Sequence, residues 1–237
     1  MFFETMNIEA EKIGVSLSKE QINLFETLYH DILQANEKFN LTAIKAQEEF
    51  ILKHYIDSLA GLRFLSGGDS VIDVGCGAGF PSFPLAIAKN DIKITALDST
   101  SKKIAFLNEE AKKLNLKNLI GVAARAEDAG KGAMRESFDA AISRAVAPLP
   151  ILLELLAPFV KSGGKILAYK TDESELEGAA DKLKELSIKL TCTERFNMPY
   201  GKRAILIFEK EGALLEKYPR QYGQIKKKPL WEIKERT

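Results

Sequence analysis

The hydrophobic pattern of the first 66 residues is that of helices. Ser18 and Gln21 have the spacing of a capping box, which predicts a helix that begins after Ser18. Apolar side chains then recur every three or four residues, at Ile22, Phe25, Tyr29, Ile32 and Leu33. A second helical pattern ends near Gly61, and residues 66–69 predict a turn. We therefore expect a helical N-terminal region over residues 1–66.

From residue 70 onward, short β-branched runs alternate with helical patterns. The runs predict strands over residues 70–74, 93–97, 118–123, 138–143 and 165–169, with helical patterns at 84–88, 102–114, 151–159 and about 175–186. Such alternation is typical of parallel strands joined by crossover helices. Two further runs, 188–196 and 203–210, flank Pro199-Tyr200-Gly201 and predict a hairpin. The expected fold is α/β, a doubly wound, mostly parallel seven-stranded sheet with an antiparallel edge strand.

Composition narrows the class of protein. The 237 residues are 46% hydrophobic and 28% charged, which is ordinary for a globular chain. Cys76 and Cys192 lie far apart, with no His or Cys at ligand spacing, so we expect no metal and a reducing, cytoplasmic location. The apolar stretch 151–160 is broken by Glu154 and Pro158 and is too short to span a bilayer, and the acidic N-terminus does not have the form of an export signal.

The most informative segment is the glycine loop, residues 75–79, between a predicted strand and a predicted helix. Gly75, Gly77 and Gly79 stand at alternate positions, so the backbone can turn sharply and approach a ligand closely. The dinucleotide fingerprint G-x-G-x-x-G would need a glycine where Phe80 stands. The acidic Asp73 just before the loop suits a cationic cofactor and would repel a pyrophosphate. S-adenosylmethionine, which has a sulfonium and an α-amino group, fits this pattern.

Two later positions agree with that cofactor. Asp98 ends the second predicted strand, 19 residues after Gly79, where a carboxylate can accept both ribose hydroxyls. Ala126 and Glu127 follow the third predicted strand, where a backbone amide and a polar side chain can meet the adenine. Two alternatives remain open from the residues alone: glycines that serve only a tight turn, and a different nucleotide.

Several motifs together resemble one family. They are the segments 39–42 (FNLT), 54–59 (HYIDSL), 72–81 (IDVGCGAGFP), 97–99 (LDS), 142–145 (ISRA), 218–220 (YPR) and 227–230 (KKPL). The chain resembles the bacterial small-subunit (16S) ribosomal RNA guanine-N7 methyltransferases, the RsmG or GidB family, over nearly all of its length. The glycine loop alone indicates only a methyltransferase, whereas the other elements are far more specific.

Residues 217–237 form a basic tail that we expect to be irregular. The resemblance implies a class I, Rossmann-like methyltransferase domain over residues 67–216. It implies that Gly75 and Phe80 line the methionine side of the cofactor. The remaining cofactor-binding candidates are Asp73, Gly77, Gly79, Asp98, Ser99, Thr100, Ala126, Glu127 and Arg144. Ser82 stands where the family often has glycine, and Lys170-Thr171 where Lys-Gly is usual.

The implied reaction needs no obvious acid–base pair. Guanine N7 keeps an in-plane lone pair and has no proton, so the enzyme has only to hold it in line with the methyl group and sulfur. Arg144 and His54 are the catalytic candidates. Arg144 suits a phosphate or the O6 edge of guanine, or else an ion pair with Asp73 or Asp98. His54 fits either an RNA contact or a packed core position. Asn40 and Thr42 either cap the second predicted helix or bind a ligand.

Positive charge is concentrated in the tail. Residues 217–237 contain seven Lys and Arg against two Glu, a net charge of +5 in a chain whose total is +1. Arg220, Lys226, Lys227 and Lys228 are the RNA-binding candidates, and the tail also contains Tyr218, Tyr222 and Trp231, which suit base stacking. The alternative is a solvated basic terminus that aids solubility.

The expected partner is small-subunit ribosomal RNA, either naked or within the assembled subunit, with S-adenosylhomocysteine as the second product. We expect a monomer. Two other functions stay open: a methyltransferase that acts on a different substrate, and a ribosome-associated regulator that binds S-adenosylmethionine without transferring its methyl group. An NAD-dependent oxidoreductase is disfavoured by Phe80.

Overall fold

The structure is a computed structural model, and it describes residues 1–232. Its N-terminal elements are α1 (Phe2–Lys12), α2 (Lys19–Phe39), α3 (Gln47–Phe50), the π-helical η1 (Ile51–Ile56), α4 (Asp57–Leu59) and the 3-10 turn η2 (Leu62–Phe64). The capping box is confirmed. The Ser18 side chain accepts a hydrogen bond from the Gln21 N–H (3.2 Å), and the Ser18 N–H donates to the Gln21 side chain (2.8 Å).

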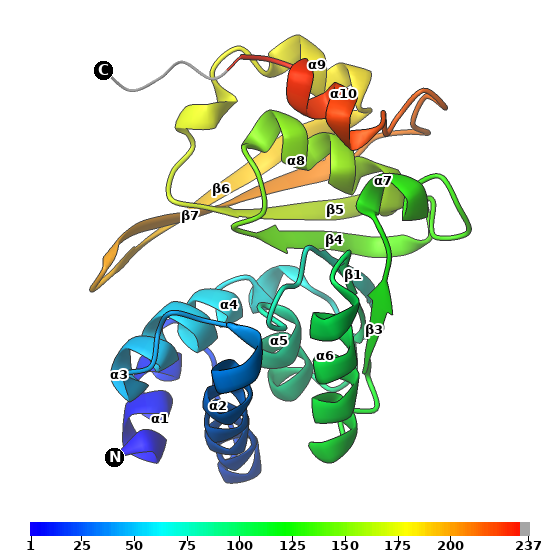
Figure 1. The fold of residues 1–237 in the computed structure, drawn as a ribbon. Coiled ribbons are helices and arrows are strands. Elements are labelled where there is room, and N and C mark those ends of the chain that lie inside the picture. Colours follow the sequence, from blue (N-terminus) through cyan, green and yellow to red (C-terminus); the bar gives the residue numbers. More distant parts are fainter. Residues whose placement is uncertain (233–237) are drawn as a thin grey trace. The chain divides into compact units, whose positions relative to one another are not determined.

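The sheet has seven strands in the order β3-β2-β1-β4-β5-β7-β6. They are β1 (Ser70–Val74), β2 (Lys93–Asp98), β3 (Leu119–Ala123), β4 (Phe138–Arg144), β5 (Val160–Lys170), β6 (Ile188–Met198) and β7 (Gly201–Lys210). The pairs β1–β4, β2–β3 and β4–β5 are parallel, whereas β7 runs antiparallel to both β5 and β6. The predicted α/β fold is therefore confirmed, including the antiparallel edge (Figure 1).

Helices connect the parallel strands, as the alternating pattern predicts. They are α5 (Ser82–Ala88), α6 (Ser101–Lys113), α7 (Ala126–Ala129) and α8 (Leu149–Leu156), which continues into the 3-10 turn η3 (Ala157–Phe159). The pattern predicts α5, α6 and α8 but not the short helix α7. The helix predicted at about 175–186 is shorter than expected. It is divided into the 3-10 turn η4 (Ser174–Leu176) and α9 (Ala180–Glu185), because Gly178 between them has a left-handed φ of +81°.

The tail differs from its expected irregular form, because residues 222–227 form the helix α10 (Tyr222–Lys227). Its Ile225 is fully buried and packs against Ile151 and Leu155 of α8. A single apolar residue in a basic segment gives too weak a periodic signal to predict a helix. The burial of Ile225 against α8 stabilises it instead.

The chain divides into two compact units. The first unit comprises Met1–Asp69 and Cys76–Ala123, and the second comprises Ser70–Gly75 and the chain from Ala124 onward. In the first unit, the N-terminal helices share an aromatic core in which the Tyr55 ring lies 4.8 Å from Phe25 and 5.2 Å from Phe50, centroid to centroid. The helical region 1–66 thus belongs to the same compact unit as β2 and β3, and the division at residues 66 and 216 stays a prediction.

None of the helices in residues 1–232 combines the length and the hydrophobicity needed to span a bilayer. In the same range no group of three or more His, Cys, Asp or Glu side chains is arranged to hold a metal ion.

Candidate active site

The glycine loop adopts backbone conformations that favour glycine. Gly75, Gly77 and Gly79 have φ values of +76°, +57° and +94°. A Cβ atom at Gly75 would lie 2.4 Å from Cγ2 of Val146, and one at Gly79 would lie 2.2 Å from Cδ2 of Phe83. The tight turn therefore requires glycine at positions 75 and 79, because both the φ angle and the close neighbours exclude a side chain.

In the first unit, Asp98 at the end of β2 holds the glycine loop. Its Oδ2 accepts a hydrogen bond from the Gly77 N–H (3.0 Å), and its Oδ1 accepts one from the Thr100 N–H (2.8 Å). The Cys76 N–H also donates to the carbonyl of Leu97 (3.1 Å). Asp98 is partly exposed, and Ser99 and Thr100 follow it as exposed residues just before α6. The carboxylate is thus fixed in position while one side of it stays accessible.

His54 and Phe80 form a stacked pair, also in the first unit. Their rings lie 4.5 Å apart with an interplanar angle of 12°. His54 Nε2 lies 2.8 Å from Thr42 Oγ1, and the Thr42 N–H donates to Asn36 Oδ1 (2.8 Å). The FNLT and HYIDSL motifs therefore meet, and Thr42 holds the imidazole that covers Phe80.

Asn40 has a backbone role. It ends α2 in the left-handed conformation, with φ of +49°, and its N–H donates to the Asn36 carbonyl (3.3 Å). Asparagine tolerates this conformation better than most residues. Asn40 therefore caps the end of the first predicted helix and not the start of the second, where Ala46 is the N-cap residue of α3.

In the second unit, β1 and β4 bring Asp73 and Arg144 to the same end of two neighbouring strands. Asp73 is fully buried and pairs in register with Ile142, two residues before Arg144. The Ser143 hydroxyl donates to the Val74 carbonyl (2.7 Å), so β4 is tied to the start of the glycine loop. Ala145 directly after Arg144 has a left-handed φ of +57°. Such strain at a strand end is common at functional sites.

A charged cluster that the sequence analysis did not identify fastens the loop after Arg144. Lys170 at the end of β5 donates to the Ala147 carbonyl (2.9 Å) and to both carboxylate oxygens of Glu175 (3.0 Å each). Glu175 also accepts the Leu149 N–H at the start of α8. The Trp231 indole donates to the Glu175 carbonyl (2.8 Å). The hydrogen-bonded residues are separated by 26 and 56 positions in the sequence, so no local motif predicts this cluster.

The predicted adenine-binding positions begin a short helix of the second unit. Ala126 and Glu127 are the first two residues of α7, and the side chain of Glu127 is buried. Position 82, where the chain departs from the family pattern, begins α5 in the first unit and is fully buried.

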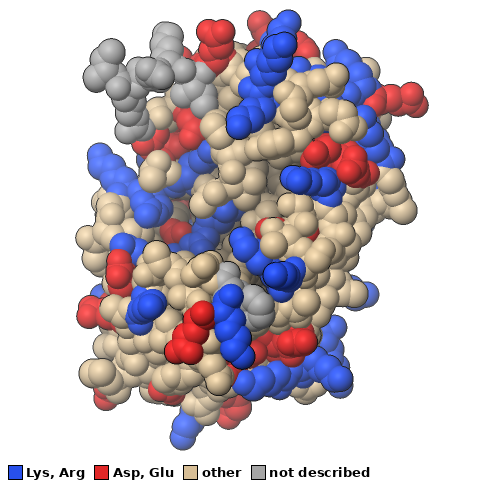
Figure 2. Space-filling model, in the orientation of Figure 1, with Lys and Arg blue, Asp and Glu red and all other residues tan. Residues whose placement is uncertain are grey.

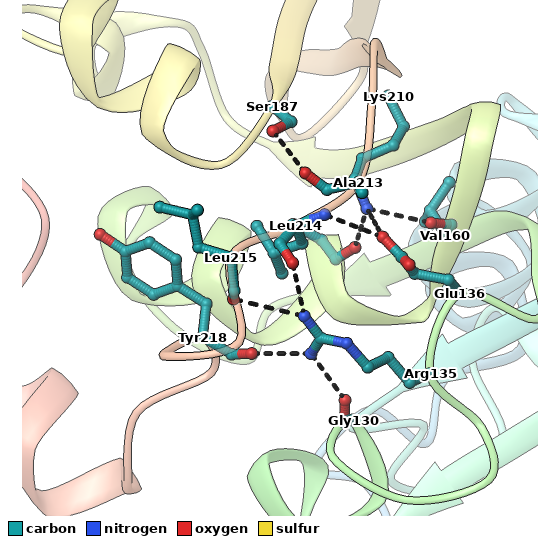
Figure 3. Close-up of polar contacts among 11 residues, drawn as sticks. Gly130, Arg135, Glu136, Val160, Ser187, Lys210, Ala213, Leu214, Leu215 and Tyr218 are labelled. Carbon is teal, nitrogen blue, oxygen red and sulfur yellow. Dashed lines mark hydrogen bonds and ion pairs between the residues drawn. The ribbon is translucent and has the colours of Figure 1, made fainter.

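Two cations fasten the chain that leads into the tail (Figure 3). Arg135 donates to the carbonyls of Tyr218 (2.7 Å), Leu214 (2.9 Å), Leu215 (3.3 Å) and Gly130 (3.3 Å). Fully buried Lys210 donates to Glu136 Oε1 (3.0 Å), which also accepts the Leu214 N–H (2.9 Å). Burial lowers the pKa of Lys210, and the ion pair with Glu136 opposes this shift. Residues 211–218 are therefore held firmly despite their lack of regular secondary structure.

Arg220, an RNA-binding candidate, has a structural partner. Its Nε donates to Glu154 Oε1 (2.8 Å), its NH2 group to Oε2 (2.6 Å), and its backbone N–H also to Oε1 (2.9 Å). Glu154 of α8 is fully buried, and its hydrogen bonds raise the pKa of Arg220. The guanidinium that the sequence assigned to RNA thus compensates a buried carboxylate.

The aromatic residues of the tail are placed differently from the expectation. Tyr218 and Trp231 are buried, and the Tyr218 hydroxyl donates to Glu185 (2.7 Å). Burial, with this hydrogen bond, raises the pKa of Tyr218 to about 12. Of the three rings considered for stacking, only that of Tyr222 is exposed. The expectation was therefore wrong for Tyr218 and Trp231, whose apolar area stabilises the fold.

The three consecutive lysines keep an exposed position. Lys226 and Lys227 end α10 and Lys228 follows it, and all three are exposed. Lys234 and Arg236, which contribute to the tail's charge, lie outside the described residues. On the face drawn in Figure 2, Lys and Arg side chains lie among acidic and uncharged residues, as the net charge of +1 leads one to expect.

Sequence comparisons agree on one family. A profile of the family GidB, described as rRNA small subunit methyltransferase G, matches residues 21–204. A protein of Acetivibrio thermocellus named Ribosomal RNA small subunit methyltransferase G is 42% identical over 227 residues, which cover 93% of each chain. A protein of the same name from Staphylococcus aureus (strain Newman) is 39% identical over 98% of this chain and 100% of its own length.

Solved structures show the same fold at low identity. The TYW2 protein of M. jannaschii in complex with AdoMet superposes with a TM-score of 0.52, at 21% identity, over 66% of this chain and 76% of its own. The [4+2]-cyclase SpnF superposes with a TM-score of 0.56, at 15% identity, over 84% and 98%. The Rossmann-like methyltransferase fold expected from the resemblance is confirmed. From the match over residues 21–204 and the full-length relatives, the chain belongs to the GidB family, rRNA small subunit methyltransferase G.

Proposed function

We propose that this protein transfers the methyl group of S-adenosylmethionine to N7 of one guanosine in small-subunit (16S) ribosomal RNA. The observation that carries the proposal is the similarity over nearly the whole chain to proteins named Ribosomal RNA small subunit methyltransferase G. The geometry of the glycine loop and Asp98 supports it independently, because it fits the cofactor that such a reaction needs.

The hydrogen bonds of Asp98 leave its carboxylate able to bind the ribose of the cofactor. An ionised carboxylate has about four acceptor positions. The N–H groups of Gly77 and Thr100 take one position on each oxygen, and the carboxylate is partly exposed. Each oxygen therefore retains acceptor capacity for a ribose hydroxyl. The glycine loop presents backbone without side chains, which allows close approach by the methionine part.

The residues that would hold S-adenosylmethionine lie in the glycine loop and at the ends of strands. In the first unit they are Gly77, Gly79, Phe80, Asp98, Ser99 and Thr100, and in the second they are Asp73, Gly75, Ala126, Glu127 and Arg144. When bound, the cofactor supplies an electrophilic methyl group on a sulfonium. The buried negative charge of Asp73 favours a cation near the glycine loop.

The protein contributes to the reaction mainly by holding the target base in position relative to the methyl group. Guanine N7 has a free lone pair, so no side chain has to remove a proton. The strained turn at Ala145 and the Lys170–Glu175 cluster hold the loop after β4, which fixes the backbone that carries Arg144. Besides its place beside the cofactor, we assign Arg144 a contact with the target nucleotide. We assign His54 to positioning Phe80 through its stacked ring.

Lys226, Lys227 and Lys228 supply the RNA-binding charge in this proposal. They are exposed, and the helix that carries two of them is anchored by Ile225 and by the Arg220–Glu154 pair. Lysines on an anchored helix lose less freedom on binding than lysines on a disordered tail, so each phosphate contact contributes more to affinity.

The test is a methyl-transfer assay with labelled S-adenosylmethionine. The purified protein is incubated with small ribosomal subunits and, separately, with deproteinised 16S rRNA, both from cells that lack the gene. Label is then mapped by strand scission specific for N7-methylguanosine. Label at one guanosine of 16S rRNA is expected, and comparison of the two RNA preparations identifies the assembly state that is methylated.

Two other results would contradict the proposal. Label on protein or on other RNA would indicate a methyltransferase with a different substrate. Cofactor binding without any label would indicate a regulator, since the same fold in the [4+2]-cyclase SpnF shows that the fold alone does not define the reaction.

A further inference from the structure

The hairpin of β6 and β7 extends beyond the end of β5. The last residue of β5, Lys170, pairs with Ala204, and pairing between β6 and β7 continues past this point to Met198 and Gly201. Residues 195–203, which we call the ribbon tip, therefore project as a two-stranded ribbon, visible in Figure 1 as the free end of the hairpin.

The ribbon tip projects from the edge of the sheet that carries Arg144. Arg144 pairs with Tyr169, which pairs with Ile205, so these three residues form one row across the strands. At about 4.8 Å between strands, Ile205 lies roughly 10 Å from Arg144, and the tip reaches about 13 Å beyond this row at about 3.3 Å per residue. In open α/β sheets, ligands bind at the carboxyl ends of the parallel strands, which is this edge.

The composition of the ribbon tip suits a nucleic acid. It contains Arg195, Lys202 and Arg203 and no acidic residue, which is a charge of +3 in a chain whose total is +1. Arg195 and Lys202 are exposed, and the register places them with Asn197 on one face of the ribbon. Cationic and amide side chains on one exposed face are typical of contacts to phosphates and sugars.

Two contacts fix the shape of the ribbon tip. Arg195 Nε donates to Glu173 Oε1 (2.8 Å), which ties the tip to the segment that follows β5. The Arg203 guanidinium lies 4.6 Å from the centroid of the Tyr200 ring. A ribbon held in this way loses little conformational entropy when it binds. Aromatic rings and guanidinium groups such as those of Tyr200 and Arg203 are the side chains on which unpaired bases stack.

We propose that the ribbon tip is a second RNA-binding surface, which contacts the phosphates of nucleotides outside the target guanosine. The proposal rests on the proposed function in one respect, namely that the RNA reaches the edge of the sheet where Arg144 lies. Because the tip touches no reacting atom, it contributes to affinity for the RNA and not to the rate of methyl transfer.

The test compares two double variants with equal charge change. Lys202→Gln with Arg203→Gln neutralises the ribbon tip, whereas Lys184→Gln with Lys189→Gln neutralises two exposed lysines near the opposite end of β6. Binding to small ribosomal subunits is measured by filter retention at several KCl concentrations, and kcat and KM are measured with the same subunits. Lys202→Gln alone, at an exposed position, guards against loss of folding in the double variant.

We expect the ribbon-tip variant to bind about 10-fold more weakly and to raise KM by a similar factor, with kcat within about twofold of the wild type. The slope of log Kd against log salt should fall by roughly 0.7 to 0.9 for each phosphate that the variant no longer neutralises. Lys202→Gln alone should give about half the effect on the logarithmic scale, and the Lys184/Lys189 variant should match the wild type.

Three results would overturn the inference. One is equal binding by the two double variants. Another is weaker binding with an unchanged salt slope, which would indicate contact with a ribosomal protein. The third is failure of the wild type to bind subunits. If the wild type binds subunits without methylating them and the ribbon-tip variant still binds more weakly, the proposed function fails while this inference stands.

Discussion

At the scale of single residues, Asp98 joins the fold to the proposed chemistry. The same carboxylate that holds Gly77 and Thr100 is the one expected to accept the ribose hydroxyls. The backbone N–H groups fix the direction in which the oxygens point, so the carboxylate is preorganised before any ligand binds. A residue with both roles should be more sensitive to substitution than its partial exposure suggests.

Asp98→Ala should therefore weaken S-adenosylmethionine binding by about 10- to 100-fold, since hydrogen bonds to a charged group contribute about 1.5–3 kcal/mol. Affinity for small ribosomal subunits should change less than about twofold. Asp91→Ala, which removes an exposed carboxylate of the same unit, is the control. Calorimetric titration of the cofactor and filter binding of subunits measure the two affinities, and equal losses in both would show that the roles are assigned wrongly.

Glycine at position 75 is required for two separable reasons, its φ angle and its contact with Val146. Gly14 has nearly the same φ, +74° against +76°, but no atom within 4 Å of an added Cβ. Gly14→Ala should therefore cost about 1 kcal/mol of unfolding free energy, and Gly75→Ala about 2–4 kcal/mol. Val146→Ala should recover part of the loss in the Gly75→Ala background. Urea unfolding measures all three, and equal losses at the two glycines would rule out the steric contribution.

At the scale of elements, the segment after β7 is ordered by contacts that are distant in sequence. Arg135 binds four carbonyls, Lys210 and Glu136 fix Leu214, and Arg220 neutralises Glu154 under α10. The conformation of this segment therefore depends on its contacts with the rest of the second unit. Removal of one buried partner should destabilise more of the segment than the number of lost hydrogen bonds implies.

Arg220→Ala should lower the free energy of unfolding by about 3 kcal/mol, because it leaves the buried Glu154 carboxylate without its charged partner. Adding Glu154→Leu should restore most of that stability, because the buried charge is then removed. Both values come from urea unfolding curves. A loss below about 1 kcal/mol for the single variant would mean that Arg220 is free to bind RNA, as the sequence alone suggested.

At the scale of the whole molecule, the net charge is small and the charged residues are unevenly distributed along the chain. A chain with a net charge of +1 has no general attraction for RNA, so binding has to come from local groups such as Lys226, Lys227 and Lys228. Local groups make distinct and countable phosphate contacts. Their contribution should therefore separate from cofactor binding.

Lys227→Glu with Lys228→Glu should weaken binding to small ribosomal subunits at least about 10-fold and reduce the salt slope by roughly 1.4 to 1.8, since two phosphates are no longer neutralised. Affinity for S-adenosylmethionine should stay within about twofold of the wild type. Lys112→Glu with Lys117→Glu makes the same change of charge at two exposed lysines of the first unit and serves as control. If this control weakens binding equally, net charge and not the tail determines affinity.

The sequence by itself determined the order and type of most elements and the positions of the chemistry-bearing loop. The run of β-branched residues predicted β1 at residues 70–74, and the spacing of Ser18 and Gln21 predicted the capping box, because both signals are local. The glycine loop and Asp98 were likewise predictable, since a strand, a turn and an acid at fixed spacing are short-range features.

The tertiary structure decided which side chains are buried or paired by contacts between residues far apart in sequence. Arg220 lies beside Glu154, 66 residues away, and Trp231 lies beside Glu175, 56 residues away, so two candidates for RNA binding or stacking became parts of the packed molecule. Burial and pairing across such separations leave no periodic trace, because they depend on which surfaces the folded chain brings together.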